Sequence, residues 1–89
     1  MIEFSEKAMR DLQAIRKRDG IEQMLTLLEW SERLAEPATR MTAEHLGGER
    51  DLFRLRVGEY HIIFQLRESP RRDSIRITRI RQRRPLPPL

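Results

Sequence analysis

The sequence predicts an α+β domain in which an N-terminal helical hairpin packs on one face of a twisted antiparallel sheet of three to five strands. Apolar residues recur at helical spacing over residues 5–18 and again over 21–35. From residue 52 to 66, by contrast, apolar and polar residues alternate as in a half-buried strand. Consecutive helices followed by consecutive strands are typical of α+β folds. The 89 residues suffice for one domain, which we expect at 1–84, followed by a proline-rich tail at 85–89.

The first helix is expected from residue 5 to 18, after a short edge strand at residues 1–4. Ser5 suits the N-cap, and Gly20 follows the helix at the position that glycine favours. The buried stripe of this helix should consist of Ala8, Leu12 and Ile15.

A second helix should follow at once and form an antiparallel hairpin with the first. Asp19 and Glu22 have the spacing of a capping box, and Pro37 discourages helix past Ala35. We expect its apolar face to contain Ile21, Met24, Leu25 and Leu28, widened by Leu27, Trp30 and Leu34.

The strands follow. Residues 41–46 are a weak strand candidate, and Gly58-Glu59 suits a type II′ hairpin turn within residues 52–66. This turn pairs Val57 with Tyr60, Leu55 with Ile62 and Phe53 with Phe64 on one side, and Arg56 with His61, Arg54 with Ile63 and Leu52 with Gln65 on the other. The last strand, residues 74–84, should either bulge or end near Thr78-Arg79, because Ile80 breaks the alternation of Ile75 and Ile77. The helices should cover the aromatic side and leave the arginine side open.

Composition limits the possible functions. The 18 Lys and Arg residues exceed the 14 Asp and Glu residues, giving a formal net charge of +4, and lysine occurs only at Lys7 and Lys17. Arginine-rich surfaces favour polyanionic partners such as nucleic acid, the ribosome or an acidic peptide, although they can also be merely solvated.

Other functional classes are disfavoured. Without cysteine, disulfides and thiolate metal sites are excluded, and two histidines are too few for a zinc site without carboxylates. We therefore expect no metal and no cofactor. No segment resembles a signal peptide or approaches the ~18 apolar residues of a membrane span, so we expect a cytoplasmic protein without membrane contact.

A family resemblance is carried by two segments, HLGGERDLFRLRVGEYHIIFQL and IRITRIRQRR. They resemble the RelE/ParE superfamily of bacterial and archaeal toxins, whose members carry a Leu-x-Gly step, a Leu-Arg-Val-Gly-x-Tyr-Arg-Ile-Ile-Phe hairpin and a last strand ending in Ile-x-x-Arg or Ile-x-His-Arg. The resemblance covers nearly the whole chain. It implies a small toxin that is neutralised by a cognate antitoxin protein.

The resemblance implies one of three functions. The first, which we take as the main expectation, is a RelE-like toxin that inhibits translation by metal-independent cleavage of mRNA on the ribosome. The second is a ParE-like toxin that inhibits DNA gyrase without nuclease activity. The third is a catalytically weakened homologue that acts mainly as an antitoxin-binding module.

The resemblance also implies site residues, which we assign by matching positions of this sequence to the motifs of the RelE/ParE superfamily. Arg54 and Arg56 match the basic residues before the hairpin turn, Arg83 matches the arginine that closes the last strand, and His61 stands where relatives have arginine. Two departures weigh against efficient cleavage. Gln82 replaces a frequent histidine, and residues 84–89 contain neither the terminal tyrosine nor a second histidine.

The expected chemistry assigns two kinds of role. His61 is the candidate base, because it titrates near neutrality, and Arg54 and Arg83 would stabilise the charge on the reacting phosphate. Contacts with the RNA backbone are expected from Arg56, Arg76, Arg79 and Arg81.

Plainer interpretations stay open for these residues. His61 could be an ordinary polar residue, and Arg54 and Arg56 a solvated or antitoxin-binding strip. Tyr60 is expected in the core, and Trp30 is expected to take part in helix packing. An acidic antitoxin segment should lie across the basic sheet or the groove of the helical hairpin.

Overall fold

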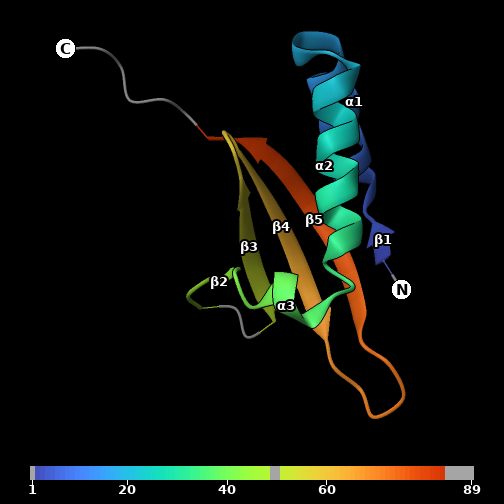
Figure 1. Cartoon of the computed structure of the whole chain (residues 1–89), viewed down its shortest axis with the longest axis vertical. Coiled ribbons are helices and arrows are strands. Elements are labelled where there is room, and N and C mark those ends of the chain that lie inside the picture. Colours follow the sequence, from blue (N-terminus) through green and yellow to red (C-terminus); the bar gives the residue numbers. More distant parts are fainter. Residues whose placement is uncertain (1, 49–50, 84–89) are drawn as a thin grey trace, which may run out of the picture.

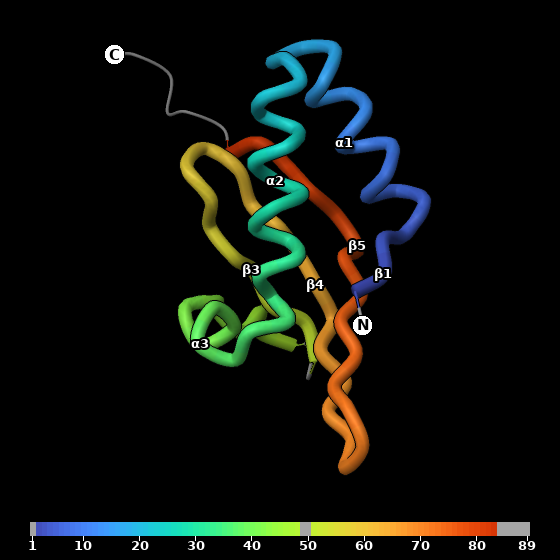
Figure 2. The backbone as a smooth tube through the Cα atoms, turned by 45° about the vertical axis from the view of Figure 1, so that its right-hand side comes forward, coloured from blue at the N-terminus to red at the C-terminus, as the bar shows by residue number. Residues whose placement is uncertain are grey.

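The computed structural model describes residues 2–48 and 51–83, and within them the predicted α+β architecture is confirmed. Five described strands form one sheet in the order β1-β5-β4-β3-β2, and α1 and α2 run side by side along it (Figures 1 and 2). The elements are β1 (Ile2–Phe4), α1 (Glu6–Asp19), α2 (Ile21–Arg33), α3 (Pro37–Arg40), β2 (Glu44–His45), β3 (Leu52–Val57), β4 (Tyr60–Arg67) and β5 (Ser74–Gln82).

The β3–β4 hairpin has the predicted register at every pair. Gly58 has a φ of +58°, whereas no described non-glycine residue has a positive φ, and this combination fits a type II′ turn at Gly58-Glu59. Because side chains alternate between the two sides of a strand, Leu55, Ile62 and Phe64 are buried while Arg56 is exposed. The hairpin therefore separates the core face from the arginine face as the sequence predicts.

The predicted bulge in β5 is also confirmed. Ile63 pairs with Arg79 but Phe64 pairs with Ile77, so Thr78 is the extra residue. The hydroxyl of Thr78 donates a hydrogen bond to the carbonyl oxygen of Ile63 at 3.1 Å. The bulge restores the alternation, so that Ile77 and Ile80 are both buried.

The first helix is held directly against β5. The Ser5 hydroxyl caps α1 by accepting from the Ala8 amide at 3.1 Å, and it donates to the carbonyl oxygen of Thr78 at 2.9 Å. One turn later, the Asp11 carboxylate accepts from the Ile80 amide of β5 at 2.9 Å. The stripe of Ala8, Leu12 and Ile15 is buried, as predicted.

The second helix differs from the prediction in its cap and its buried face. Its N-cap is Gly20, with a φ of +102° and no side-chain hydrogen bond, so the predicted Asp19 capping box is wrong. Asp19 is the last residue of α1, and its carboxylate is bonded to Arg18 and Tyr60 instead. The buried face consists of Leu27, Ser31 and Leu34, with Met24, Leu28 and Trp30 half-buried, whereas Ile21 and Leu25 are exposed.

The connection after α2 contains an element that the sequence did not predict. Pro37 is the first residue of the short helix α3. The Arg40 guanidinium at its end donates to the carbonyl oxygens of Leu34 and Ala35 and pairs with Asp73 at 2.9 Å. The predicted strand at residues 41–46 is shortened to β2, Glu44–His45, because the amides of residues 41–43 donate back to carbonyl oxygens of α3.

Two further differences concern the sheet. β1 is the predicted edge strand but pairs with β5 in parallel, so the sheet is not purely antiparallel. β5 ends at Gln82, so Arg83 is not part of the strand, contrary to the prediction, and residue 84 and the tail at 85–89 lie outside the described residues. Within the described part of the chain, no helix is long and apolar enough to cross a membrane.

The Ser5 anchor yields a test of stability. We expect Ser5→Ala to lower the free energy of unfolding by about 1–2 kcal/mol, because it removes an N-cap and a hydrogen bond between α1 and β5. Urea denaturation measures this change. Ser74→Ala, at an exposed serine, should stay within about 0.5 kcal/mol of the wild type. Equal losses in the two variants would contradict the anchoring role.

Candidate functional site

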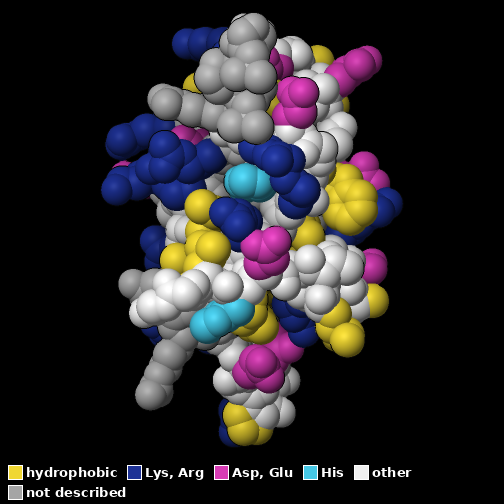
Figure 3. Space-filling model, turned by 90° about the vertical axis from the view of Figure 1, so that its left-hand side faces the viewer, with side chains coloured by type: hydrophobic (Ala, Val, Ile, Leu, Met, Phe, Trp, Pro, Cys, Tyr) yellow, Lys and Arg dark blue, Asp and Glu magenta, His cyan; other side chains and the backbone are white. Residues whose placement is uncertain are grey.

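The face of the sheet opposite the helices carries a row of basic side chains. Pairing across three strands places Arg56 of β3, His61 of β4 and Arg81 of β5 in one row. The next row contains Arg54, Ile63 and Arg79, and Glu44 of β2 pairs with Arg54 at its end. Figure 3 shows Lys and Arg side chains gathered around a histidine on one side of the molecule. We call this surface the open face.

Four of the predicted site residues meet in one hollow of this face. It encloses about 310 Å³ and is lined by Thr42, Glu44, Arg54, Arg56, His61 and Arg83. Arg83 reaches it because the Arg83 amide donates to the carbonyl oxygen of Glu59 in the β3–β4 turn. We call this hollow the arginine pocket. Two of its guanidinium groups come from β3, at Arg54 and Arg56, and the third comes from Arg83, after β5.

Arg54 has a carboxylate partner inside the pocket. Its Nη2 donates to Oε2 of Glu44 at 2.7 Å. The hydrogen bond from Arg54, together with the positive charge of that group, lowers the pKa of the Glu44 carboxyl. Glu44 is therefore ionised at neutral pH, and the pocket contains three positive charges and one negative charge.

His61 titrates below its ordinary range in this environment. Partial burial disfavours the charged imidazolium and is the main cause of the lowered pKa, and the positive charges of Arg54, Arg56 and Arg83 add to it. Glu44 opposes this effect. The neutral imidazole that predominates at pH 7 can accept a proton, as a general base must.

The remaining predicted RNA contacts lie outside the pocket. Arg79 pairs with Asp11 of α1, with Nε at 2.9 Å from Oδ2 and Nη2 at 3.2 Å from Oδ1. Arg81 lies in the row of His61 but lines a separate hollow beside Arg79. Arg76 is exposed farther along β5, where it pairs with Gln65 and Glu3. The structure thus brings together Arg54, Arg56, His61 and Arg83, and not Arg76, Arg79 or Arg81.

Two pocket residues were missed from the sequence. Thr42 and Glu44 belong to the segment that was only a weak strand candidate, without an assigned partner. Glu44 reaches the pocket because β2 pairs with β3 in a register that places it opposite Arg54. No local pattern specifies that register, so only the pairing of Glu44 with a strand ten residues away could have identified it.

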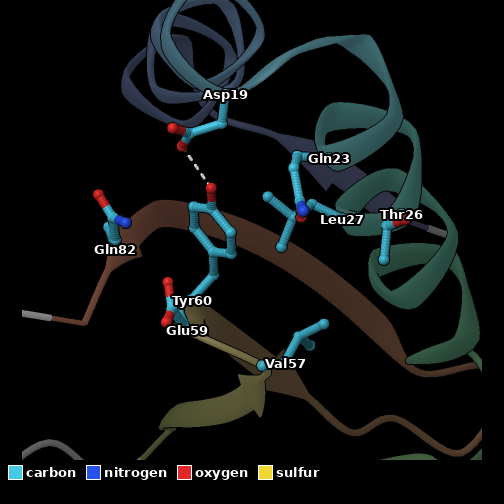
Figure 4. Close-up of a pocket in the computed structure, with 9 residues that line it drawn as sticks. Asp19, Gln23, Thr26, Leu27, Val57, Glu59, Tyr60 and Gln82 are labelled. Atoms are coloured by element: carbon cyan, nitrogen blue, oxygen red, sulfur yellow. Dashed lines mark hydrogen bonds between the residues drawn. The ribbon is translucent and has the colours of Figure 1, made fainter. Parts of the chain in front are cut away.

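A second hollow lies on the helical side of the same hairpin tip. It encloses about 570 Å³ between the start of α2 and the β3–β4 turn, and Leu27, Val57, Glu59 and Gln82 are among its walls. Figure 4 shows the Tyr60 ring directed from the hairpin to the end of α1, where its hydroxyl donates to the Asp19 carboxylate. Burial and this hydrogen bond raise the pKa of Tyr60. Tyr60 is buried, as predicted, and ties the hairpin to the helices.

The geometry of the arginine pocket suits an anion. Three guanidinium groups can hold a phosphate and stabilise charge that develops on it. A neutral His61 can accept a proton, and the Glu44 carboxylate can pair with a cation. Among the described residues, no group of three His, Asp or Glu side chains is arranged to hold a metal ion.

The chain matches a known protein family over nearly its whole length. Residues 2–87 match the family described as ParE toxin of type II toxin-antitoxin system, parDE. No curated protein is significantly similar in sequence.

Solved structures share the fold at low sequence identity. A chain of the toxin-antitoxin complex RelBE2 from Mycobacterium tuberculosis is 19% identical with a TM-score of 0.72, over 93% of this chain and 96% of that one. A chain of the chromosomal ParDE system from P. aeruginosa is 19% identical with a TM-score of 0.65, over 93% and 95%. The YoeB/ParE toxin from Agrobacterium tumefaciens is 13% identical with a TM-score of 0.58, over 93% and 98%.

The electrostatics of the pocket give a test by titration. We expect Arg56→Gln to raise the pKa of His61, because it removes a positive charge that disfavours the imidazolium. NMR titration of the His61 ring measures this pKa directly. Arg76→Gln, on the same face but outside the pocket, removes the same charge and should change the pKa of His61 much less. Equal shifts would show that net charge rather than proximity sets this pKa.

Proposed function

Because this chain belongs to the ParE toxin family of type II toxin–antitoxin systems, within the RelE/ParE superfamily, we propose that it is a ParE-like toxin that inhibits DNA gyrase. The observation that carries this proposal is the match of residues 2–87 to the ParE family model. Membership also gives the toxin a cognate antitoxin as its partner. The absence of a tyrosine or second histidine from residues 84–89 supports a non-nucleolytic action.

The open face is the surface that we propose for contact with the target. The substrate of DNA gyrase is DNA, so the toxin would meet DNA when it meets the enzyme. The open face has Arg54, Arg56 and Arg83 in one pocket and can bind the phosphate backbone of that DNA. Arginine keeps its charge and matches phosphate with two donors. Binding of this kind should weaken as salt rises, because it releases counterions from the nucleic acid.

A second candidate is ribosome-dependent cleavage of mRNA, and the position of His61 is the observation that favours it. His61 lines the same pocket as the three arginines, and its lowered pKa keeps it neutral at pH 7. In this reaction His61 would take the proton of a ribose 2′-hydroxyl, the 2′-oxygen would attack the adjacent phosphorus, and the bond to the 5′-oxygen would break. Arg54 and Arg83 would stabilise the charge on the phosphate, the leaving 5′-oxygen would take up a proton from a water molecule, and His61 would return its proton to the solvent.

The antitoxin is proposed to use charge complementarity. An acidic segment laid across the open face would pair with its arginines and cover the arginine pocket. Neutralisation would then consist of blocking the surface that contacts the target. Its association rate should fall as salt rises.

A direct comparison of the two targets tests the function. We expect purified toxin to cause gyrase-dependent breaks in plasmid DNA and to leave mRNA uncut in an in vitro translation reaction read by primer extension. Codon-specific cuts in translated mRNA, without gyrase-dependent breaks, would establish the second candidate instead. Addition of the cognate antitoxin should abolish whichever activity is seen.

His61 separates the two mechanisms further. If the toxin cuts mRNA, His61→Ala should reduce cleavage by about 10²–10⁴-fold, because it removes the proton acceptor. If the toxin inhibits gyrase, the same variant should retain its inhibition, whereas Arg54→Ala should weaken it. Equal midpoints of urea denaturation for the variants and the wild type exclude misfolding as the cause of a lost activity.

A further inference from the structure

One acidic side chain lies among the residues that line the arginine pocket. Glu44 Oε2 accepts from Arg54 Nη2 at 2.7 Å, so the carboxylate occupies a donor that a phosphate oxygen would need. The remaining lining side chains are the neutral Thr42 and four that can carry positive charge, Arg54, Arg56, His61 and Arg83. Glu44 therefore competes with any anion that enters the pocket.

Comparison with Asp11 shows that Glu44 is more exposed and accepts fewer hydrogen bonds. The Asp11 side chain is 17% exposed and accepts two hydrogen bonds from Arg79 and one from the Ile80 amide, so it supports the packing of α1 on β5. The Glu44 side chain is 71% exposed and accepts a hydrogen bond from Arg54. An exposed pair of this kind contributes little to stability, and solvent can replace either partner.

We propose that Glu44 is an internal competitor that holds Arg54 in the free protein and is displaced when a polyanion binds. A single phosphate gains little by displacing Glu44, because it exchanges one anion for another at Arg54. A nucleic-acid backbone reaches Arg54, Arg56 and Arg83 with successive phosphates and so outweighs the lost ion pair. Glu44 thereby lowers the affinity of every anion that binds at Arg54, and only a ligand with several phosphates binds tightly despite this competition.

The charges around the pocket support this role. His61 of β4 is faced by Glu44 from β2, Arg54 and Arg56 from β3, Arg81 from β5 and Arg83 beyond β5. The negative charge of Glu44 raises the pKa of His61, whereas the positive charges of the arginines lower it. Removal of Glu44 should therefore free Arg54 and also lower the pKa of His61. The inference needs only an anion in the pocket, and it holds for a DNA or an RNA target.

The test compares the affinities of full-length Glu44→Gln and the wild type for two probes, inorganic phosphate and a fluorescent 2′-deoxy oligonucleotide that cannot be cleaved through a 2′-hydroxyl. We expect phosphate to bind about 3- to 10-fold more tightly to Glu44→Gln, because this variant lacks one partly exposed charge that competes with the phosphate. The oligonucleotide should gain by a similar factor, because both ligands displace the same carboxylate from Arg54. NMR shifts of the pocket residues report phosphate binding, and fluorescence anisotropy reports the oligonucleotide.

Glu22→Gln is the matched control, because Glu22 is exposed on α2 and its loss changes the net charge equally. Its affinities should stay near those of the wild type. An unchanged phosphate affinity in Glu44→Gln, or an equal gain in Glu22→Gln, would overturn the proposal. Weaker binding in Glu44→Gln would do so too, since it would show that Glu44 orients Arg54 for the anion. The NMR titration of His61 adds a second readout, in which its pKa should fall in Glu44→Gln only.

Discussion

The fold depends on the register of the β3–β4 hairpin. Phe53 pairs with Phe64 on the core side, with their rings stacked at 5.6 Å between centroids, and Arg56 pairs with His61 on the other. A shift by one residue would bury arginines and expose the aromatic rings, so burial of the apolar face fixes the pairing. The glycine turn supports the same register, because Gly58 adopts the positive φ that the turn requires. The sidedness of Arg54, Arg56 and His61 on the open face follows from this constraint.

Contacts between the helical layer and the sheet keep the open face open. Ser5 and Asp11 bond to the backbone of β5, and Tyr60 bonds to Asp19 at the end of α1. These polar contacts surround a core in which Leu12, Leu27 and Phe64 are fully or almost fully buried. Because α1 and α2 pack on the core face, they leave the arginine face uncovered. The fold thus leaves one surface of the sheet for a partner.

The hairpin tip serves both faces at once. Tyr60 and His61 are adjacent in β4, yet one lines the hollow beside the helices and the other the arginine pocket. Alternation along a strand makes this arrangement unavoidable. A partner bound at either hollow contacts the same short turn, and the Arg83 amide bonded to Glu59 ties the end of the described chain to that turn as well.

The sequence by itself determined the layers, the hairpin register, the bulge at Thr78 and the sidedness of Arg54, Arg56 and His61, because each follows from local periodicity and turn chemistry. It misassigned the Asp19 cap and the faces of Ile21 and Leu25, since these depend on which neighbours a helix meets. Only the tertiary structure showed that Arg79 is paired with Asp11, that β1 runs parallel to β5 and that Glu44 enters the arginine pocket. These contacts join residues distant in the chain, and their geometry depends on how the layers pack, which no local pattern encodes.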